Sequence, residues 1–369
     1  GQSCIVWQHS FWVSICTALH RVCRVRRIRM RTVVTLDPRN KVPFASFYLE
    51  GLRMMFGEKS LNYSVSSFVD LNRAKDYSYD HYMCFIVARG DMKRKIIIDF
   101  HDSISISAEA YRWCDVYAKI NIATTTDMSS WPKLISIPPG FGIRTKSVAG
   151  TLIGGIKDLL RMKFRPINGL YAQFYNTYAM LLRPTIQKYE QKSESVSGYV
   201  FHASTLWSVD NCMQFTNPYR ATFIRTCKSL PEIRFEGGLI KTHGDIPQEY
   251  EDVASNKRYK FHEYFQNTMR SMFVFNTPAV HQCHGWKLGE YLAMGKAIIS
   301  TPISNRLPFP FEDGKNLLVV HNQEELVEAI HRLSTDNELR RSLEESSRNI
   351  YTNYCSPIAV MRSVLGDFL

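Results

Sequence analysis

Residues 281–301 read HQCHGWKLGEYLAMGKAIIST, and this stretch decides the fold that the sequence predicts. A glycine-bearing loop leads into an amphipathic helix, and a short apolar strand follows after a break at Gly295. The first turn of such a helix has free backbone N–H groups and a partial positive charge, which suit an anion such as phosphate. His284 and Lys287 stand where they can contact this anion, and Glu290 lies one helical turn farther along.

Apolar strands alternate with helices on both sides of this stretch, which is typical of parallel sheets covered by helices on both faces. A chain of 369 residues is also longer than one hydrophobic core usually supports. We therefore predict an α/β fold of two Rossmann-like domains that face each other across a cleft. The expected domains are 30–195 with a helical insert and 196–355, and a C-terminal helix in 356–369 is expected to pack back on the first. Ligands of open α/β sheets bind beyond the carboxyl ends of the strands, so the cleft is the expected site.

The individual elements follow from the spacing of apolar residues and from the Gly, Pro and Asp residues at the breaks. The expected strands are 32–36, 61–68, 82–88, 95–100, 116–122, 134–137, 199–203, 233–236, 271–276, 297–299 and 316–320. The expected helices are 44–56, 108–114, 217–229, 259–269, 323–333 and 337–353.

The chain is basic, with 46 Lys and Arg against 34 Asp and Glu and a net charge of +12. Six arginines lie between Arg21 and Arg31, and no acidic residue precedes Asp37. Such a charge distribution indicates nucleic acid, an anionic membrane surface or a phosphate-bearing substrate as a partner. Residue 1 is Gly and the first Met is Met30, so we interpret residues 1–29 either as an extension foreign to the native protein or as an amphipathic membrane anchor.

Residues 143–195 interrupt the α/β alternation. Apolar and basic residues are mixed in 151–165, and 169–182 is rich in aromatic residues. Two interpretations stay open: helices packed on the first domain, or a basic apolar surface that rests on a membrane. The second would make this a peripheral protein at the inner face of a membrane.

Nine scattered cysteines without a CxxC pair fit reduced thiols in the cytoplasm better than a disulfide framework. No run of about 18 apolar residues occurs, so no transmembrane helix is expected. His281, Cys283 and His284 are close in sequence but lack a distant fourth ligand, and no HExxH motif occurs. We therefore expect no bound metal.

Other phosphate-binding and catalytic motifs are absent from the sequence. It contains no GxxxxGK[ST] loop, no GxGxxG after the first strand and no GxSxG nucleophile elbow. These absences argue against a P-loop NTPase, a standard dinucleotide-binding enzyme and an α/β-hydrolase. What remains is an anion site at a helix start with a carboxylate one turn inside it.

Three segments together resemble the donor-binding half of GT-B glycosyltransferases, which carry an E-x7-E motif, an A-x-G-K/L-P-V-I run and a short EDG-xN loop. Glu290 matches the second Glu of that motif, and AMGKAII at 293–299 matches the run. The loop at 312–316, EDGKN, and the helix at 324–333 complete the similarity. The pattern looks like that of bacterial surface-polysaccharide transferases, which build lipopolysaccharide or capsule.

Two positions depart from the pattern of that family. Gln282 replaces the first Glu, and Ala297 replaces the usual Pro. The first Glu is often linked to the transferred sugar in retaining families, so the stereochemical outcome stays open.

The resemblance implies a nucleotide-sugar donor, based on UDP or GDP, in the C-terminal domain, and a glycan or lipid-linked acceptor. Glu290 would accept hydrogen bonds from the ribose hydroxyls. Lys287 and Arg220 would face the diphosphate, where a cation stabilises the leaving group and lets this fold work without a metal or other cofactor. The other residues implied near the phosphates are His284, Gly285 and Trp286.

The acceptor side is expected where the strand at 95–100 ends, at His101 and Asp102. A base must remove the proton of the acceptor hydroxyl in an inverting transferase, and both side-chain types suit that task. A simple turn with a capping Asp is the alternative. Gly140 and Gly142 are expected to let backbone approach the substrate, or to serve the turn alone.

Other functions stay open beside the hexosyltransferase that we expect. A nucleotide-sugar epimerase on the same fold would need no separate acceptor. A nucleic-acid-binding protein would rest on the basic N-terminus only, and we expect no nucleic acid as a partner. A non-catalytic scaffold is a further alternative.

Overall fold

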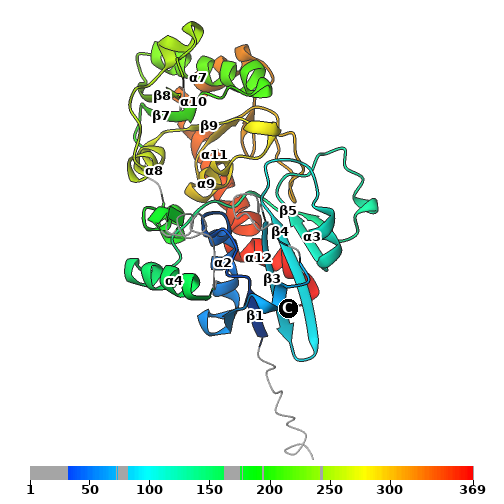
Figure 1. Ribbon diagram of the computed structural model, residues 1–369. Coiled ribbons are helices and arrows are strands. Elements are labelled where there is room, and N and C mark those ends of the chain that lie inside the picture. The colour runs from blue at the N-terminus through cyan, green and yellow to red at the C-terminus, as the bar shows by residue number, and fades with distance from the viewer. Residues whose placement is uncertain are drawn as a thin grey trace, which may run out of the picture.

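The structure is a computed structural model, and it describes residues 32–71, 73, 82–161, 175–176, 178–192, 195–241 and 244–368. Residues 1–29, expected as a foreign extension or a membrane anchor, lie outside the described residues, as does a part of the helical insert expected over 143–195, mainly 162–174. Two lobes are visible in Figure 1, with the first sheet in one and the strands after residue 198 in the other.

Six strands form the N-terminal sheet, in the order β2-β1-β3-β4-β5-β6. β3 runs antiparallel to β1 and β4, whereas the other neighbours pair in parallel. The predicted parallel sheet is therefore wrong for β3, because a turn at Gly90, where φ is 60°, folds β3 back on β4 as a hairpin. The strands are β1 Thr32–Leu36, β2 Leu61–Tyr63, β3 Tyr82–Arg89, β4 Met92–Asp99, β5 Val116–Lys119 and β6 Leu134–Ser136.

All strands of this sheet except β3 point in one direction, so their carboxyl ends meet at one edge. That edge contacts the second domain directly. Asn121 Oδ1 accepts the backbone N–H of His284 at 2.8 Å, and Ser136 Oγ donates to the carbonyl of Arg306 at 2.9 Å. The two domains therefore meet at the edge where a parallel sheet presents its functional loops.

Helices α2 and α12 pack against each other beside the N-terminal sheet (Figure 1). An added Cβ at Gly51 of α2 would lie 2.2 Å from the carbonyl oxygen of Pro357, so the close approach of the two helices needs glycine. The end of the chain thus returns to the first domain. The helices of this lobe are α2 Val42–Phe56, α3 Ala108–Trp113, α4 Val148–Arg161, α6 Ile186–Glu190 and α12 Pro357–Leu365.

The C-terminal domain contains a parallel pair, β7 and β8, and a three-stranded parallel sheet, β11-β10-β9. β8 continues through Gly237 and Gly238, beyond the expected end at residue 236. An added Cβ at Gly237 would lie 2.0 Å from the carbonyl oxygen of His202, so the close pairing with β7 needs glycine there. The strands are β7 Tyr199–Thr205, β8 Arg234–Ile240, β9 Val274–Asn276, β10 Ile298–Ser300 and β11 Leu318–Val319. The helices are α7 Asn217–Ser229, α8 Phe261–Arg270, α9 Trp286–Met294, α10 Gln323–Thr335 and α11 Asn337–Ile350.

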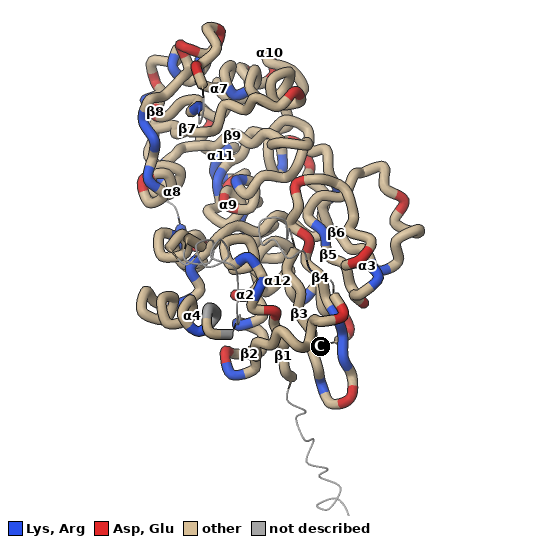
Figure 2. Tube along the Cα trace, viewed as in Figure 1, with Lys and Arg blue, Asp and Glu red and all other residues tan. Residues whose placement is uncertain are grey.

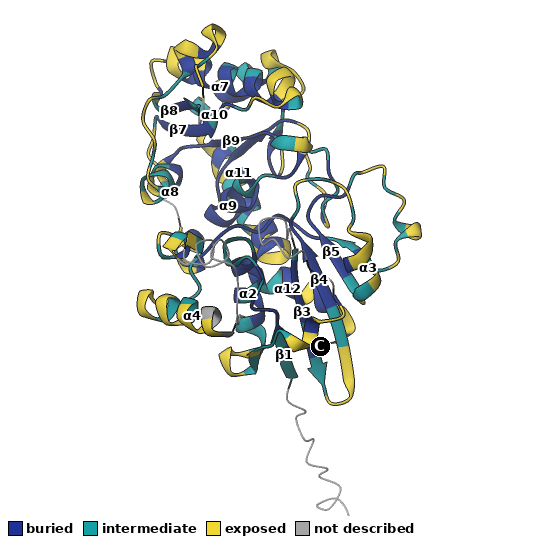
Figure 3. Ribbon diagram, in the orientation of Figure 1, coloured by how far each residue is buried: buried dark blue, intermediate teal, exposed yellow. Residues whose placement is uncertain are grey.

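Charges of both signs are distributed over the two lobes (Figure 2). Helix α4 projects from the N-terminal lobe, and most of its visible surface is exposed (Figure 3). Within the described ranges, none of the helices offers an apolar stretch of membrane-spanning length.

Candidate functional site

A cavity of about 410 Å³ lies in the C-terminal domain at the carboxyl ends of β7 and β9. The start of α9 and one side of α8 complete its wall. No carboxylate is among the residues that line it. They are His202, Ala203, Ser204, Thr205, Trp207, Arg220, Ile240, Tyr259, Phe261, Tyr264, Phe275, Asn276, Thr277, Ala279, Gly285 and Lys287.

Lys287 enters this cavity from the first turn of α9. Its Nζ donates a hydrogen bond to the carbonyl of Ala203 at 2.7 Å. Burial lowers the pKa of Lys287 to about 7, and the positive charge of Arg220 acts in the same direction, while the carboxylate of Glu290 opposes them. The ammonium group is thus held by a neutral acceptor and is ready for an anionic one.

Arg220 is buried and reaches the cavity from α7. Its guanidinium donates to Thr277 Oγ1 and to the carbonyl of Thr205, both at 3.0 Å. Burial lowers the pKa of Arg220 to about 10, so the side chain stays charged at neutral pH. Two cations therefore share one cavity with neutral hydrogen-bond partners, which favours a ligand with two or more negative charges.

The start of α9 adds a third source of positive potential. Gly285 is the N-cap residue, it has no capping side chain, and it lines the cavity. Free N–H groups of the first turn and the helix dipole favour an anion at this place. The arrangement suits a diphosphate.

His202 is a lining residue that the sequence did not indicate as functional. Its Nε2 pairs with Ser204 Oγ at 3.0 Å, while its buried Nδ1 has no hydrogen-bond partner in the described structure. Burial lowers its pKa well below the ordinary value, so the ring is neutral at pH 7. The signal for His202 was its place as a polar residue within the first strand of the second domain, β7.

Glu290 lies outside the lining of this cavity and is buried. Its Oε1 accepts a hydrogen bond from the Tyr189 hydroxyl at 3.2 Å and lies 3.8 Å from Arg183 Nη1. Burial raises the pKa of Glu290, although the charge of Arg183 and the Tyr189 hydroxyl oppose that rise. Both partners come from the segment before the second domain, and only the structure reveals them.

Trp286 also lies outside the cavity, in the contact between the domains. Its ring packs edge-on against Phe44 with centroids 4.9 Å apart, and the Arg183 guanidinium lies 5.4 Å from its ring centre. The structure thus places Trp286 against the first domain, and its contact with the donor stays a prediction.

The buried Asn121 joins the predicted acceptor side to the predicted donor loop. Its Nδ2 donates to the carbonyl of His101 at 2.9 Å, and its Oδ1 accepts the N–H of His284 at 2.8 Å. The His284 ring is buried, its Nε2 lacks a partner in the described structure, and burial lowers its pKa to about 4. His284 is therefore a neutral side chain at the domain contact, outside the cavity lining.

The backbone N–H of His101 donates to Asp99 Oδ1 at 2.8 Å, which fixes the loop after β4. Asp99 Oδ2 also accepts from Lys119 Nζ at 2.9 Å and from the Tyr117 hydroxyl at 2.6 Å. His101 and Asp102 lie at the edge that faces the second domain, but neither lines the cavity of Lys287. Burial raises the pKa of the Cys283 thiol to about 12, and the adjacent Asp102 carboxylate contributes to that rise.

Gln282, at the position of the first Glu, faces a different cavity of about 340 Å³, together with Asn211 and Phe215. Its φ of 57° and that of His281, 55°, are uncommon for residues other than glycine. The carbonyl of Gln282 accepts hydrogen bonds from Ser304 Oγ and Asn305 Nδ2 at 2.9 and 3.1 Å. These contacts hold the loop in its unusual conformation.

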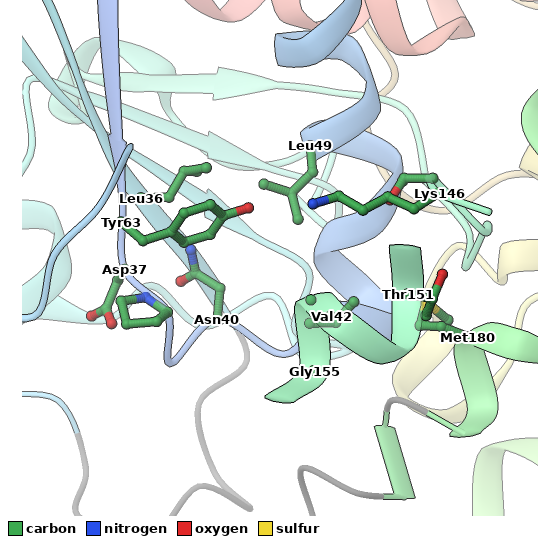
Figure 4. A pocket seen from close by; sticks show the side chains of 13 residues that line it. Leu36, Asp37, Asn40, Val42, Leu49, Tyr63, Lys146, Thr151, Gly155 and Met180 are labelled. Carbon is green, nitrogen blue, oxygen red and sulfur yellow. The ribbon is translucent and has the colours of Figure 1, made fainter. Parts of the chain in front are cut away.

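A smaller hollow of about 80 Å³ lies in the first domain, at the carboxyl ends of β1 and β2. Figure 4 shows Leu49, Tyr63 and Lys146 around it, with α4 on the opposite side. Asp37 at its edge is buried, which raises its pKa, but the hydrogen bonds from Arg39 and the charges of Arg73 and Arg39 together lower the Asp37 pKa below its ordinary value. This carboxylate is held in ion pairs and is a poor candidate for a base.

Gly140 and Gly142 both lie in close packing, not beside an open cavity. An added Cβ would lie 2.9 Å from the Tyr48 hydroxyl at Gly140 and 3.0 Å from the Pro43 carbonyl at Gly142. Elsewhere, no group of three or more His, Cys, Asp or Glu side chains is placed to hold a metal ion among the residues that the structure describes.

Residues 220–365 match the family model described as "Glycosyl transferase-like". Most of the C-terminal domain falls within this match. This match covers less than half of the chain and agrees with the expected resemblance to the donor-binding half of GT-B glycosyltransferases. The structure confirms the α/β class, with a six-stranded sheet in one lobe and two smaller parallel sheets in the other. The matched range includes the cavity residues Arg220 and Lys287 of this glycosyl transferase-like domain.

Solved structures to which the chain is similar include TarM, 13% identical over 47% of this chain and 36% of TarM, with a TM-score of 0.36. HepE from Anabaena in complex with UDP is 12% identical over 69% of this chain and 64% of HepE, with a TM-score of 0.39. A chain from Listeria monocytogenes assigned as a UDP-N-acetylglucosamine 2-epimerase is 12% identical over 89% of this chain and 94% of its own length, with a TM-score of 0.39. The chain thus spans about a third of TarM and under two thirds of HepE. No curated protein sequence matches the chain.

Proposed function

We propose that this protein is a glycosyltransferase that moves a sugar from a nucleotide-sugar donor to a hydroxyl of a glycan or lipid-linked acceptor. One observation carries the proposal: Lys287 and Arg220 share a cavity without carboxylates at the start of α9, in the glycosyl transferase-like domain. Such a cavity binds a nucleoside diphosphate and stabilises the negative charge that it gains as the leaving group.

The proposed reaction is of the hexosyltransferase type and needs no metal, because the two cations supply the charge that a metal would supply. UDP and GDP are both proposed nucleotides. Glu290 binds the ribose in this proposal, after the ribose hydroxyls replace the Tyr189 hydroxyl as its hydrogen-bond donors. His101 is the proposed base and Asp102 the second candidate, since both lie at the edge of the first sheet that faces the donor domain.

We place this activity in the synthesis of a bacterial cell-surface polysaccharide such as lipopolysaccharide. The proposed location is the cytoplasm, with peripheral contact at the inner face of the membrane. The projecting, exposed helix α4 supports that contact. The alternative of a nucleic-acid-binding protein depends on residues 1–29, outside the described part of the chain.

Calorimetric titration with a panel of UDP and GDP sugars tests the proposal. At least one member should bind, and Glu290→Ala should weaken that binding by about tenfold or more, because charge-assisted hydrogen bonds are lost. Glu328→Ala, at an exposed position of α10, is the control and should bind as the wild type does. Binding to no member of the panel, or equal binding by Glu290→Ala, would contradict the assignment. A product formed from the donor alone would identify an epimerase instead.

A further inference from the structure

A further cavity, of about 250 Å³, lies between α8 and the chain around α6. Four cationic or titratable side chains line it, and the lining contains no carboxylate. Phe265 and three residues of 181–184 supply an apolar part of the wall. The polar side chains are Arg144, Arg183, Lys188, His262 and Gln266.

Arg144 has an unused hydrogen-bond donor in this cavity. Its Nε is buried and has no partner in the described structure, although the backbone N–H of Arg144 donates to the Pro184 carbonyl at 2.9 Å. A buried donor without an acceptor is unfavourable by itself, and an anionic oxygen would satisfy it. Lys188 and His262 are exposed at the rim, where they can complete the contacts to such an oxygen.

Arg183 connects this cavity to the donor cavity. Its guanidinium stacks over the Phe261 ring, 4.0 Å from the ring centre, and Phe261 lines the cavity of Lys287. Lys287 and Arg220 do not line the Arg144 cavity, so the two cavities are adjacent but separate. An anion held by Arg144 would lie beside the donor rather than in its place.

Exposed apolar side chains lie before and after the Arg144 cavity residues in the chain. Leu182 lines the cavity and is exposed, as is Tyr178 one turn earlier. Helix α4 follows Arg144 in the chain and presents a row of exposed apolar side chains, every four residues from Val148 to Leu160, with Ile153 beside them. Its outermost members are 59% and 73% exposed, which is unusual for aliphatic residues on one face. The row consists of Val148, Leu152, Ile153, Ile156 and Leu160.

We propose that the Arg144 cavity binds the phosphate of an amphiphilic acceptor, whose hydrocarbon chain lies on the exposed apolar face of α4. The charges of the cavity are complementary to a phosphate, and the apolar row is complementary to a hydrocarbon chain. Basic positions occur on both α4 and α8 (Figure 2), which favours the same anionic partner. That this amphiphile is the acceptor of the sugar rests on the proposed glycosyl transfer. The binding of a lipid phosphate at this site does not depend on that proposal.

The test measures binding of farnesyl phosphate, farnesol and inorganic phosphate to the full chain, with the lipids below the concentration at which they form micelles. Farnesyl phosphate should bind at least about tenfold more tightly than either of the other two probes, because it alone uses both surfaces. Arg144→Ala combined with Lys188→Ala should weaken farnesyl phosphate binding by about tenfold or more. Arg144→Lys, which keeps the charge, should retain most of it, and Arg332→Ala on α10 should have no effect.

Leu152→Ser combined with Ile156→Ser tests the apolar face. Both side chains are exposed, so the fold should be unaffected, and farnesyl phosphate should then bind no better than inorganic phosphate. Unchanged binding in either double variant overturns the proposal. So does equal binding of farnesyl phosphate and inorganic phosphate to the wild type, which would indicate a site for free phosphate. A nucleotide sugar titrated into the same preparation tests the donor site separately, so failure of one assignment is distinguishable from failure of the other.

Discussion

Lys287 is a buried cation whose hydrogen-bond acceptor is the Ala203 carbonyl and not a carboxylate. Burying an ammonium group without an adjacent counter-ion is unfavourable, and the lowered pKa of about 7 expresses that penalty. A diphosphate in the cavity would supply the missing charge. The buried charge that is unfavourable for the protein alone therefore increases its affinity for the donor.

This environment makes donor binding depend on pH. Because the pKa of Lys287 is lowered to about 7, its charge is present at lower pH and is lost as the pH rises. The affinity for a nucleotide sugar should therefore fall as the pH is raised from about 6 to 9, by at most about tenfold per pH unit. Lys287→Met, which removes the charge and keeps the length, should bind about tenfold more weakly at the lower pH and show little pH dependence. Calorimetric titration over this range, with Lys228→Met as the control, checks the prediction. Parallel pH profiles for the wild type and Lys287→Met would contradict it.

At the scale of single residues, the sequence predicted the residues that line the donor cavity better than the residues that contact Glu290. Arg220, Gly285 and Lys287 were predicted from helix positions and the family pattern, and the structure brings them to one cavity. Arg183 and Tyr189 were not predicted, because their contacts with Glu290 join segments about a hundred residues apart. Local spacing contains no information about such pairs.

At the scale of elements, helices α2 and α12 bring together chain segments that are far apart in sequence. The contact requires Gly51, where an added Cβ would be 2.2 Å from the Pro357 carbonyl oxygen and 2.6 Å from Met361 Cγ. A backbone oxygen cannot move away as the end of a flexible side chain can. The packing of α12 on α2 thus depends on the absence of a side chain at residue 51.

Gly51→Ala should destabilise the protein by about 1–3 kcal/mol, because the added methyl group overpacks this contact. Gly154→Ala is the matched control, since Gly154 is also inside a helix and an added Cβ would meet no atom within 4 Å. The control should be neutral or more stable by up to about 1 kcal/mol, from helix propensity alone. Denaturant unfolding measures both variants. Equal stability of Gly51→Ala and Gly154→Ala would show that α12 is not held by this contact.

The sequence predicted whole elements where local signals agreed, and failed where pairing decided the outcome. Helix α7 occupies the predicted range, Asn217–Ser229. The direction of β3 was missed because the first half of β4 has no apolar pattern that would predict a strand. It is occupied by Lys93, Arg94 and Lys95. The Gly90 turn was the available signal for the hairpin, but the apolar runs alone left too long a gap between the strands.

At the scale of the whole molecule, the donor cavity belongs to one domain and the proposed base to the other. The core confirms how closely the domains meet, since one cluster of buried side chains contains Phe47 and Ile98 of the first domain and Leu288 and Ile298 of the second. Sugar transfer needs the two domains correctly placed relative to each other, whereas nucleotide binding needs only the second domain. Changes at the domain contact should separate these two properties.

Gly289 tests that separation. It lies in α9 between Lys287 and Glu290, and an added Cβ would be 2.4 Å from the carbonyl oxygen of Pro139 in the first domain. Gly289→Ala should therefore displace α9 from the first domain. Because small misplacements of reacting groups lower rates strongly, we expect kcat to fall by about tenfold or more, while the Kd of a nucleotide changes by less than about twofold. Steady-state kinetics and titration of the same preparation measure both, with Gly154→Ala as the control. An unchanged kcat would mean that the contact between the domains tolerates a methyl group at Gly289. A loss of nucleotide affinity as large as the loss of kcat would mean that the donor cavity depends on the first domain.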